Sequence, residues 1–296
     1  MTESLISING KIYNYEDAKI SVFDRGFLYG DSIYEVTISL NRKLLFFKEH
    51  LERLKISGEL INLELQFSFE EIYQQAKMLL SKFNQDNAYI RIIVTRGIGD
   101  IGLYTEEKLQ QNIVMIAKKA PYYDDELYNK GIYLNLVERL RNDKMSLDPN
   151  AKSGNYLNNI LAIQEAKKHN AYDAIMENRE GEITEGTTFN IWLVKDNVVY
   201  TPHPASGLLK GITRRKLIEF INLHKIPFKE ERCTKNDFYN ADEVFITSST
   251  KGVMPVFQLN SRVYHDKLPE NSMTKKLMNI YTESVNLHLN ENYYTF

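Results

Sequence analysis

The chain of 296 residues contains one cysteine, Cys233, so it can form neither an internal disulfide bond nor a metal site built from several cysteines. The net charge is −2 and no long run carries one sign, which gives no indication of binding to nucleic acid or to a membrane surface. The first ten residues lack a basic region followed by an apolar core, and no apolar run approaches the length of a membrane span. A cytoplasmic globular protein of one large or two medium domains is the expectation.

Several catalytic motifs are also missing. The sequence has no H-E-x-x-H, G-x-S-x-G or G-x-x-x-x-G-K-[ST] motif, and its six histidines form no pair at helical spacing. These absences predict no metal centre, and they do not favour serine hydrolase or P-loop chemistry.

One phosphate-binding motif does occur, because Gly97, Gly99 and Gly102 match G-x-G-x-x-G directly after an expected strand at 89–95. A dinucleotide fold would continue with an amphipathic helix, but residues 103–111 have little apolar face. No acidic residue stands about twenty positions after the first glycine, where the ribose ligand is expected. We favour a loop between antiparallel strands. A dinucleotide-dependent oxidoreductase is the alternative from a different class.

Apolar periodicity predicts a mixed α+β protein. Asn9-Gly10 lies between two apolar runs and predicts a hairpin at 5–15, and Ser68 with Glu71 forms the capping-box pattern of a helix at 68–83. The segment from 118 to 130 has no apolar period and contains Pro121. We therefore expect an N-terminal domain at 1–118, an interdomain loop at 119–131 and a C-terminal domain at 132–296.

Lys152 is the candidate reactive residue, since it lies where a turn at 148–150 leads into an expected helix. A lysine just before a helix start feels the positive end of the helix dipole, which disfavours its ammonium form. Partial burial would act in the same direction, and a neutral amine is a nucleophile. The alternative is an ordinary solvated lysine. The apolar face expected for the helix consists of Leu157, Ile160, Leu161, Ile163 and Ala166.

Other polar residues could assist such a lysine. Glu185 leads into a buried-looking strand, where a carboxylate needs a partner such as a protonated ring nitrogen. The segments 211–213 and 247–250 offer amides and hydroxyls for an anion, or ordinary capping. Arg53, near the apolar edge of a helix that begins at 48, could clamp a phosphate or form an ion pair with Glu49.

Pyridoxal 5′-phosphate (PLP) would use this whole set, because it needs a lysine for a Schiff base, a carboxylate on its pyridine nitrogen and mixed phosphate ligands. At this point the sequence resembles the fold type IV aminotransferases, which include branched-chain aminotransferases, D-amino-acid aminotransferases and aminodeoxychorismate lyases. The resemblance covers nearly the whole chain, in five motifs that follow the family's order: HLERL at 50–54, AKSGNYLNNILA at 151–162, EITEGTTFN at 182–190, LKGITR at 209–214 and ADEVFITSST at 241–250.

This resemblance implies a small N-terminal α/β domain, a larger C-terminal domain with a mixed, barrel-like sheet, and PLP bound at their junction. It makes Lys152 the lysine that bonds to PLP and shuttles protons, with Glu185 on the pyridine nitrogen and Tyr156 near the 3′-oxygen. The phosphate ligands that it implies are Arg53, Ile212, Thr213, Ser248 and Ser249. It also implies a homodimer, or a larger homo-oligomer, in which a loop of the partner subunit closes the site.

The same motifs also limit the choice of substrate class. Tyr89, Arg91 and the loop 97–103 resemble branched-chain enzymes, and Tyr29 and Tyr34 fit that resemblance as pocket walls for an aliphatic side chain. The run Tyr34-Glu35-Val36 instead resembles D-amino-acid aminotransferases. Tyr29, Tyr34 and Val36 could also form plain core. By resemblance, the amides at Ser249 and Thr250 hold the substrate carboxylate.

Two departures bear on this interpretation. D-amino-acid aminotransferases carry Arg-x-His where this chain has Ile101 and Leu103, and Lys251 departs from the common branched-chain pattern. We predict transfer of an amino group from a branched-chain L-amino acid to a 2-oxoacid such as 2-oxoglutarate. The alternatives are a D-amino-acid or (R)-amine aminotransferase, an aminodeoxychorismate lyase, and a non-catalytic binding protein on the same scaffold.

Overall fold

The computed structural model describes residues 4–104 and 108–290, which divide into two compact units. The first unit comprises Met1–Pro121, Ala151–Asn155 and Leu289–Phe296, and the second comprises Tyr122–Asn150 and Tyr156–His288. The short segment around Lys152 therefore packs with the N-terminal residues, although the residues on both sides of it in the sequence belong to the second unit. Helices and strands occur in both units, which confirms the predicted α+β class.

The first unit is built on an antiparallel sheet with the strand order β2-β1-β6-β5-β3-β4. The expected hairpin is present, and Asn9 and Gly10 have positive φ angles of 50° and 81°, as the tight turn requires. The strands are β1 (Leu5–Ile8), β2 (Lys11–Asn14), β3 (Ser32–Leu40), β4 (Lys43–Leu44), β5 (Ala88–Thr95) and β6 (Asn112–Lys119); a short helix, α1 (Arg25–Tyr29), precedes β3.

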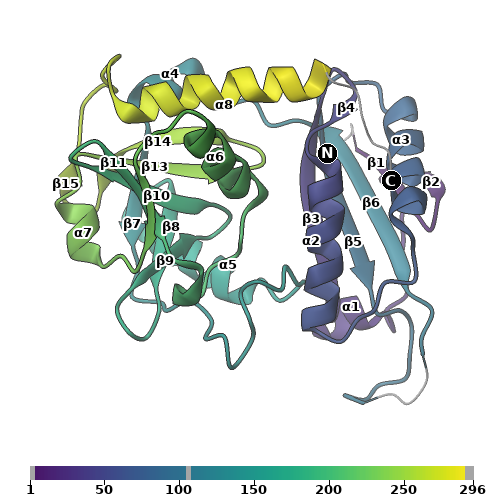
Figure 1. Cartoon of the computed structure of the whole chain (residues 1–296). Coiled ribbons are helices and arrows are strands. Elements are labelled where there is room, and N and C mark those ends of the chain that lie inside the picture. The colour runs from purple at the N-terminus through teal and green to yellow at the C-terminus, as the bar shows by residue number, and fades with distance from the viewer. Residues whose placement is uncertain (1–3, 105–107, 291–296) are drawn as a thin grey trace. The chain divides into compact units, whose positions relative to one another are not determined.

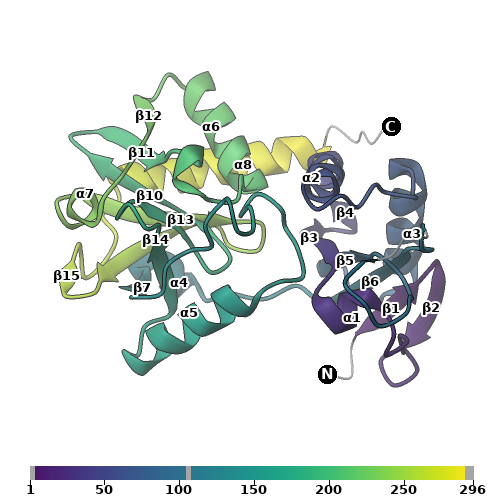
Figure 2. The ribbon, with the colours of Figure 1, turned by 90° about the horizontal axis from the view of Figure 1, so that it is seen from below.

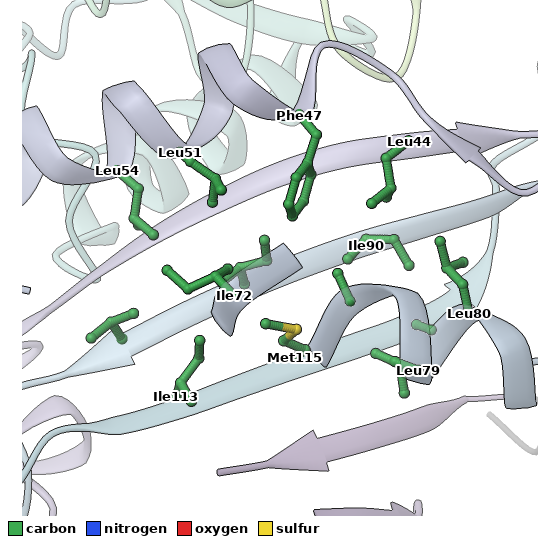
Figure 3. Close-up of a cluster of buried hydrophobic side chains, with 14 of the residues drawn as sticks. Leu44, Phe47, Leu51, Leu54, Ile72, Leu79, Leu80, Ile90, Ile113 and Met115 are labelled. Atoms are coloured by element: carbon green, nitrogen blue, oxygen red, sulfur yellow. The ribbon is translucent and has the colours of Figure 1, made fainter. Parts of the chain in front are cut away.

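Helices α2 (Phe47–Leu60) and α3 (Phe69–Lys82) cover one face of this sheet (Figures 1 and 2). The capping box of α3, formed by Ser68 and Glu71, is confirmed. Figure 3 shows the core between helices and sheet, where Leu51 and Leu54 of α2 point toward Ile90 and its neighbours. Because side chains alternate along a strand, β3 points Ile33, Glu35 and Thr37 toward the helices and Tyr34 and Val36 away from them.

The glycine-rich segment joins two antiparallel strands, as predicted, since Val94 of β5 pairs with Ile113 of β6. In the described parts of this connection, 96–104 and 108–111, the chain forms no helix, so the helix that a dinucleotide site needs is not found there. Residues 105–107 lie outside the described residues. Gly97 is required for a local reason: its φ is 107°, and an added Cβ would lie 2.0 Å from the carbonyl oxygen of Gln110.

The second unit curls a mixed sheet around its own apolar core, with the strand order β12-β11-β10-β13-β14-β7-β8-β9 and β15 paired to β14. Helix α4 lies against β14, α5 against β7 and β8, and α6 against β13. The strands are β7 (Ile132–Leu136), β8 (Asp173–Glu177), β9 (Ile183–Gly186), β10 (Asn190–Lys195), β11 (Val198–Pro202), β12 (Phe228–Glu231), β13 (Glu243–Ser248), β14 (Gly252–Leu259) and β15 (Arg262–Val263). The helices are α4 (Asp125–Lys130), α5 (Leu157–Lys168), the 3-10 turn η1 (Pro204–Ser206), α6 (Ile212–Leu223), α7 (Lys235–Tyr239) and α8 (Met273–Asn290).

Helix α5 corrects one expectation from the sequence. Leu157 and Ile160 are 65% and 46% exposed, while Asn159, Ala162 and Ala166 are buried. The predicted apolar face was therefore wrong in its first turn, because the helix packs small side chains closely against β7 and β8. Of the helices in the described part of the chain, none combines the length and apolar character of a membrane span.

Candidate functional site

Lys152 is held by the first unit through its backbone. Its carbonyl oxygen accepts a hydrogen bond from the amide of Tyr34 at 2.9 Å, and its own amide donates to the Oγ of Ser57 at 3.1 Å. Its Nζ lies 3.3 Å from the Oη of Tyr34 and 4.4 Å from the centre of that ring. The side chain is partly exposed, so a partly accessible amine is fixed beside a phenol.

The helix-dipole argument for Lys152 was wrong. Helix α5 begins at Leu157, five positions after Lys152, and the dipole acts mainly within the first turn of a helix. The position of Lys152 is set instead by pairing to β3, where Ser153 forms a bridge with Ile33.

The predicted substrate residues Tyr34, Val36, Tyr89 and Arg91 share one face of the first sheet, away from α2 and α3. In the register of β3 and β5, Val36 stands opposite Arg91. The guanidinium carbon of Arg91 lies 3.9 Å from the centre of the Tyr34 ring, so a cation covers the ring that also contacts Lys152.

Tyr29 supports the glycine-rich loop. Its Oη accepts a hydrogen bond from the amide of Gly102 at 3.1 Å, and the guanidinium of Arg25 lies 4.9 Å from its ring centre. Arg25 also donates to the carbonyl oxygens of Gly102 and Leu103, at 2.7 and 3.1 Å. Tyr29 thus fixes the shape of the loop, and its predicted contact with substrate stays a prediction.

The opposite face of β3 holds an ionic cluster that the sequence analysis missed. Glu35 is fully buried and accepts from the Nε and Nη2 of Arg53, at 2.6 and 2.7 Å, while the Nδ1 of His50 lies 2.7 Å from its Oε2. Burial raises the pKa of Glu35, but the charge and hydrogen bonds of Arg53 and His50 outweigh it and hold that pKa well below its ordinary value. Burial lowers the pKa of His50 against the opposing effect of Glu35.

Only part of this cluster had a local signal. His50 and Arg53 are three positions apart on one helix face, whereas the alternation of Tyr34 and Val36 with Glu35 predicts a polar face for the carboxylate. Arg53 therefore pairs with a carboxylate on β3 that neither interpretation of the sequence had considered. Its role as a phosphate ligand stays a prediction.

In the second unit, Glu185 also has an arginine partner. Glu185 is 5% exposed, and its Oε1 accepts from the Nε of Arg141 at 2.9 Å. Its Oε2 lies 3.5 Å from the Nδ2 of Asn190, which also donates to Leu209 at 2.8 Å. Arg141 comes from the irregular segment between β7 and α5, where periodicity gives no signal, so the sequence analysis missed it.

The first candidate anion site is the beginning of α6. Its N-cap is Gly211, and Ile212 and Thr213 belong to the first turn. An added Cβ on Gly211 would lie 2.1 Å from the Oδ1 of Asn190, so only glycine fits beside that side chain. The amides of a helix N-terminus attract anions, and this twelve-residue helix suits a phosphate.

The second candidate anion site is the turn between β13 and β14. Ser248, Ser249 and Thr250 are partly exposed there, and the Oγ of Ser248 accepts from the amide of Lys251 at 3.2 Å. Tyr156 lies in the same unit, where its Oη donates to the carbonyl of Thr187 at 3.4 Å, two residues after Glu185.

Comparison with known proteins places this geometry in a family. The family model described as "Amino-transferase class IV" matches residues 32–259. A Methanocaldococcus jannaschii protein named provisionally as a branched-chain-amino-acid aminotransferase is 37% identical, over 92% of this chain and 93% of that protein. The D-alanine aminotransferase of Staphylococcus epidermidis is also 37% identical, over 88% of this chain and 91% of that protein.

The structural comparison agrees with the sequence comparison. The branched-chain amino acid aminotransferase of T.th. with pyridoxamine 5′-phosphate superposes with a TM-score of 0.89 and 28% identity, covering 95% of this chain and 93% of that one. This likeness confirms the predicted fold type IV architecture. The lysine, the buried carboxylate and the two candidate anion sites thus occur in a chain that belongs to the class IV aminotransferase family.

Proposed function

We propose that this protein is a PLP-dependent aminotransferase that moves an amino group between a branched-chain L-amino acid and a 2-oxoacid such as 2-oxoglutarate. The observation that carries the proposal is Lys152, a half-buried residue whose Nζ lies 3.3 Å from the Oη of Tyr34. Pyridoxamine 5′-phosphate in the T.th. relative supports the choice of cofactor.

The residues of each unit fit the parts of such a cofactor. When bound, PLP supplies an electron-withdrawing ring that stabilises negative charge at the substrate Cα. In the first unit, Lys152 would bond to the cofactor and, once the substrate amine has displaced it, carry the proton to and from Cα, with Tyr34 holding its Nζ in place. In the second unit, the Glu185 carboxylate, oriented by Arg141, would keep a proton on the pyridine nitrogen.

The phosphate ligands belong to the same proposal. The amides and hydroxyl at Ile212 and Thr213 and the hydroxyls of Ser248 and Ser249 are suited to a dianion. Arg53 would contribute positive charge in addition to its pairing with Glu35. Tyr156 would hydrogen-bond the 3′-oxygen.

Substrate choice rests on the face of the first sheet that carries Tyr34 and Val36. Together with Tyr89 and Arg91 these side chains suit an aliphatic substrate, while the amides of Ser249 and Thr250 would hold its carboxylate. A D-amino acid is the second candidate, because the Staphylococcus epidermidis relative is named a D-alanine aminotransferase. Ile101 and Leu103, where such enzymes carry Arg-x-His, argue against it.

The visible spectrum of the purified protein tests cofactor and substrate together. We expect a yellow band that shifts with L-leucine and stays unchanged with D-alanine, in separate samples. A shift with D-alanine alone would keep the cofactor and replace the substrate. No band after addition of PLP would contradict the proposal as a whole.

A matched pair of variants tests the role of Lys152. Lys152→Ala should lose turnover, since no other amine is assigned to its step, while Lys55→Ala, at a surface position of α2, should behave like the parent. Activity of Lys152→Ala close to that of the parent would contradict the assignment. The family resemblance also leads us to propose a homodimer or larger homo-oligomer, and a monomer by light scattering would contradict that part.

A further inference from the structure

Lys251 is a buried cation whose role the proposed reaction leaves open. It is 9% exposed, and its Nζ lies 5.5 Å from the ring centre of Tyr123 and 5.8 Å from that of Tyr172. Within residues 4–104 and 108–290, its ammonium group has neither an ion pair nor a hydrogen bond. Aromatic faces compensate a buried cation only in part, so its positive charge remains available to a nearby anion.

The backbone of Lys251 closes the turn between β13 and β14. Its amide donates to the Oγ of Ser248 at 3.2 Å, and its carbonyl oxygen accepts from the Oη of Tyr128, on α4, at 3.0 Å. Burial raises the pKa of Tyr128 to about 12, so this phenol stays a neutral donor over the physiological range. Hydrogen bonds to the amide and to the carbonyl oxygen of Lys251 therefore hold the turn in place.

Helix α8 lies beside the same turn at Gly252, the residue after Lys251. Gly252 has a φ of 59°, and an added Cβ there would lie 3.1 Å from the ring of Tyr281. Burial raises the pKa of Tyr281 to about 12, and the side chain of Thr213, in the first turn of α6, opposes that rise. One tyrosine thus contacts both segments that are candidates for binding an anion.

Asp173 is a carboxylate that interacts electrostatically with Lys251, but it already accepts hydrogen bonds from other groups. The Oδ1 of Asp173 accepts from the Oγ1 of Thr187 at 2.6 Å and from the amide of Ala174 at 2.7 Å. Burial raises the pKa of Asp173, and the opposing effects of Thr187, Ala174 and Lys251 do not cancel that rise. Asp173 is thus an incomplete counterion for Lys251.

From these contacts we propose that Lys251 is a positioning residue, which holds the turn 248–252 in its anion-binding shape and adds positive potential there for an oxyanion. The oxyanion is either the phosphate of the cofactor or the carboxylate of the substrate. The inference rests on the proposed function, because that function places one of these groups at the turn. It accounts for a lysine at the position where this chain departs from the common branched-chain pattern.

The protein contains an internal probe for this turn. Trp192 is its one tryptophan, and the indole Nε1 donates to the Oγ1 of Thr247 at 2.9 Å, one residue before Ser248. Its fluorescence should therefore report ligand binding at the turn without any need for turnover. The probe ligands are pyridoxamine 5′-phosphate and pyridoxamine, which differ only in the phosphate.

The first arm of the test asks whether the anion is the phosphate, and it compares Lys251→Met with Lys229→Met. Lys229 is a matched control because its Nζ also lies over a tyrosine ring, 5.6 Å from the centre of Tyr200, but at an exposed position. We expect Lys251→Met to reduce the preference for pyridoxamine 5′-phosphate over pyridoxamine about tenfold. Lys251→Arg should restore most of it, and Lys229→Met should leave it unchanged. Because the preference is a ratio, a general loss of stability does not produce this result.

The carboxylate arm uses the amino acid that shifts the visible band and the same molecule as its carboxamide. If the anion is the carboxylate, Lys251→Met should raise the KM for the acid about tenfold and leave that for the amide unchanged. A change confined to one arm supports the proposal and identifies the anion. Unchanged ratios in both arms overturn it.

Two further measurements keep the test decisive. If Lys251→Met does not fold, Tyr128→Phe removes only the hydrogen bond to the turn and should reduce the affected ratio about threefold, with Tyr200→Phe as its control. An unchanged ratio for Tyr128→Phe would then overturn the inference. A parent protein that shows neither a visible band nor any preference for the phosphorylated ligand would instead contradict the proposed function.

Discussion

Among the described residues, each unit contains a glutamate–arginine pair in which both side chains are at most 10% exposed, and these two pairs differ in how the carboxylate is held. In the first unit, Glu35 is fully buried and meets Arg53 and His50 at 2.6 to 2.7 Å through both oxygens. In the second unit, Glu185 meets Arg141 at 2.9 Å and Asn190 at 3.5 Å.

The difference suggests one role for each pair: the Glu35 pair stabilises the fold, and the Glu185 pair serves the proposed reaction. Glu35 faces the helices and pairs with Arg53 and His50 of α2, so we expect its charge to act mainly on the stability of the first unit. Glu185 follows from a motif that resembles the family's cofactor site, so its charge is proposed to act on a ligand. The predictions below test this division, beginning with the largest effect.

Glu35→Gln should cost about 3–5 kcal/mol of unfolding free energy, because it removes the carboxylate that compensates a buried arginine. Urea denaturation at pH 7 measures this loss, with Glu59→Gln, at an exposed position of α2, as the control. An unchanged denaturation midpoint would show that the Glu35 cluster contributes little to stability.

Glu185→Gln should reduce turnover roughly 10²-fold, as expected when a group that stabilises charge in the transition state is neutralised. The variant should still show the visible band of bound cofactor. Steady-state kinetics at saturating cofactor measures the effect, and parental turnover would remove Glu185 from the pyridine-nitrogen role.

Arg141→Met should reduce turnover about tenfold, equivalent to about 1.4 kcal/mol, because Glu185 would keep its charge and lose its orientation. Arg139→Met, two positions earlier and exposed, is the matched control. If both variants behave alike, the pair in the second unit does not orient the carboxylate.

The smallest expected effect is a loss of stability on mild acidification. The pKa of His50 is lowered in the folded protein, so the unfolded chain binds more protons as the pH falls through 6.5, and the unfolding free energy decreases. Glu35, whose folded pKa is also lowered, adds a similar loss only below about 4.5. His50→Gln should flatten the stability curve between pH 7 and 5, whereas exposed His169→Gln should not. Parallel curves for parent and His50→Gln would exclude His50 as the cause.

Sequence reasoning succeeded where a pattern is local. The Asn9-Gly10 turn, the Ser68 capping box and the antiparallel strands around the glycine-rich loop all formed as predicted. It failed in part at α5, where the hydrophobic periodicity correctly predicted a helix and the burial of Ala166 but wrongly placed Leu157 and Ile160 on the buried face. Which face of a helix is buried depends on the strand that it meets, and small side chains allow the closest approach.

The sequence by itself determined the family, the order of its motifs and the identity of Lys152 and Glu185 as candidates, because short motifs are encoded within a few residues. Only the tertiary structure decided their partners. Tyr34 meets Lys152, Arg141 meets Glu185, and the rings of Tyr123 and Tyr172 surround Lys251. These contacts join residues far apart in the chain, and long-range packing, unlike periodicity, leaves no local pattern from which they could be predicted.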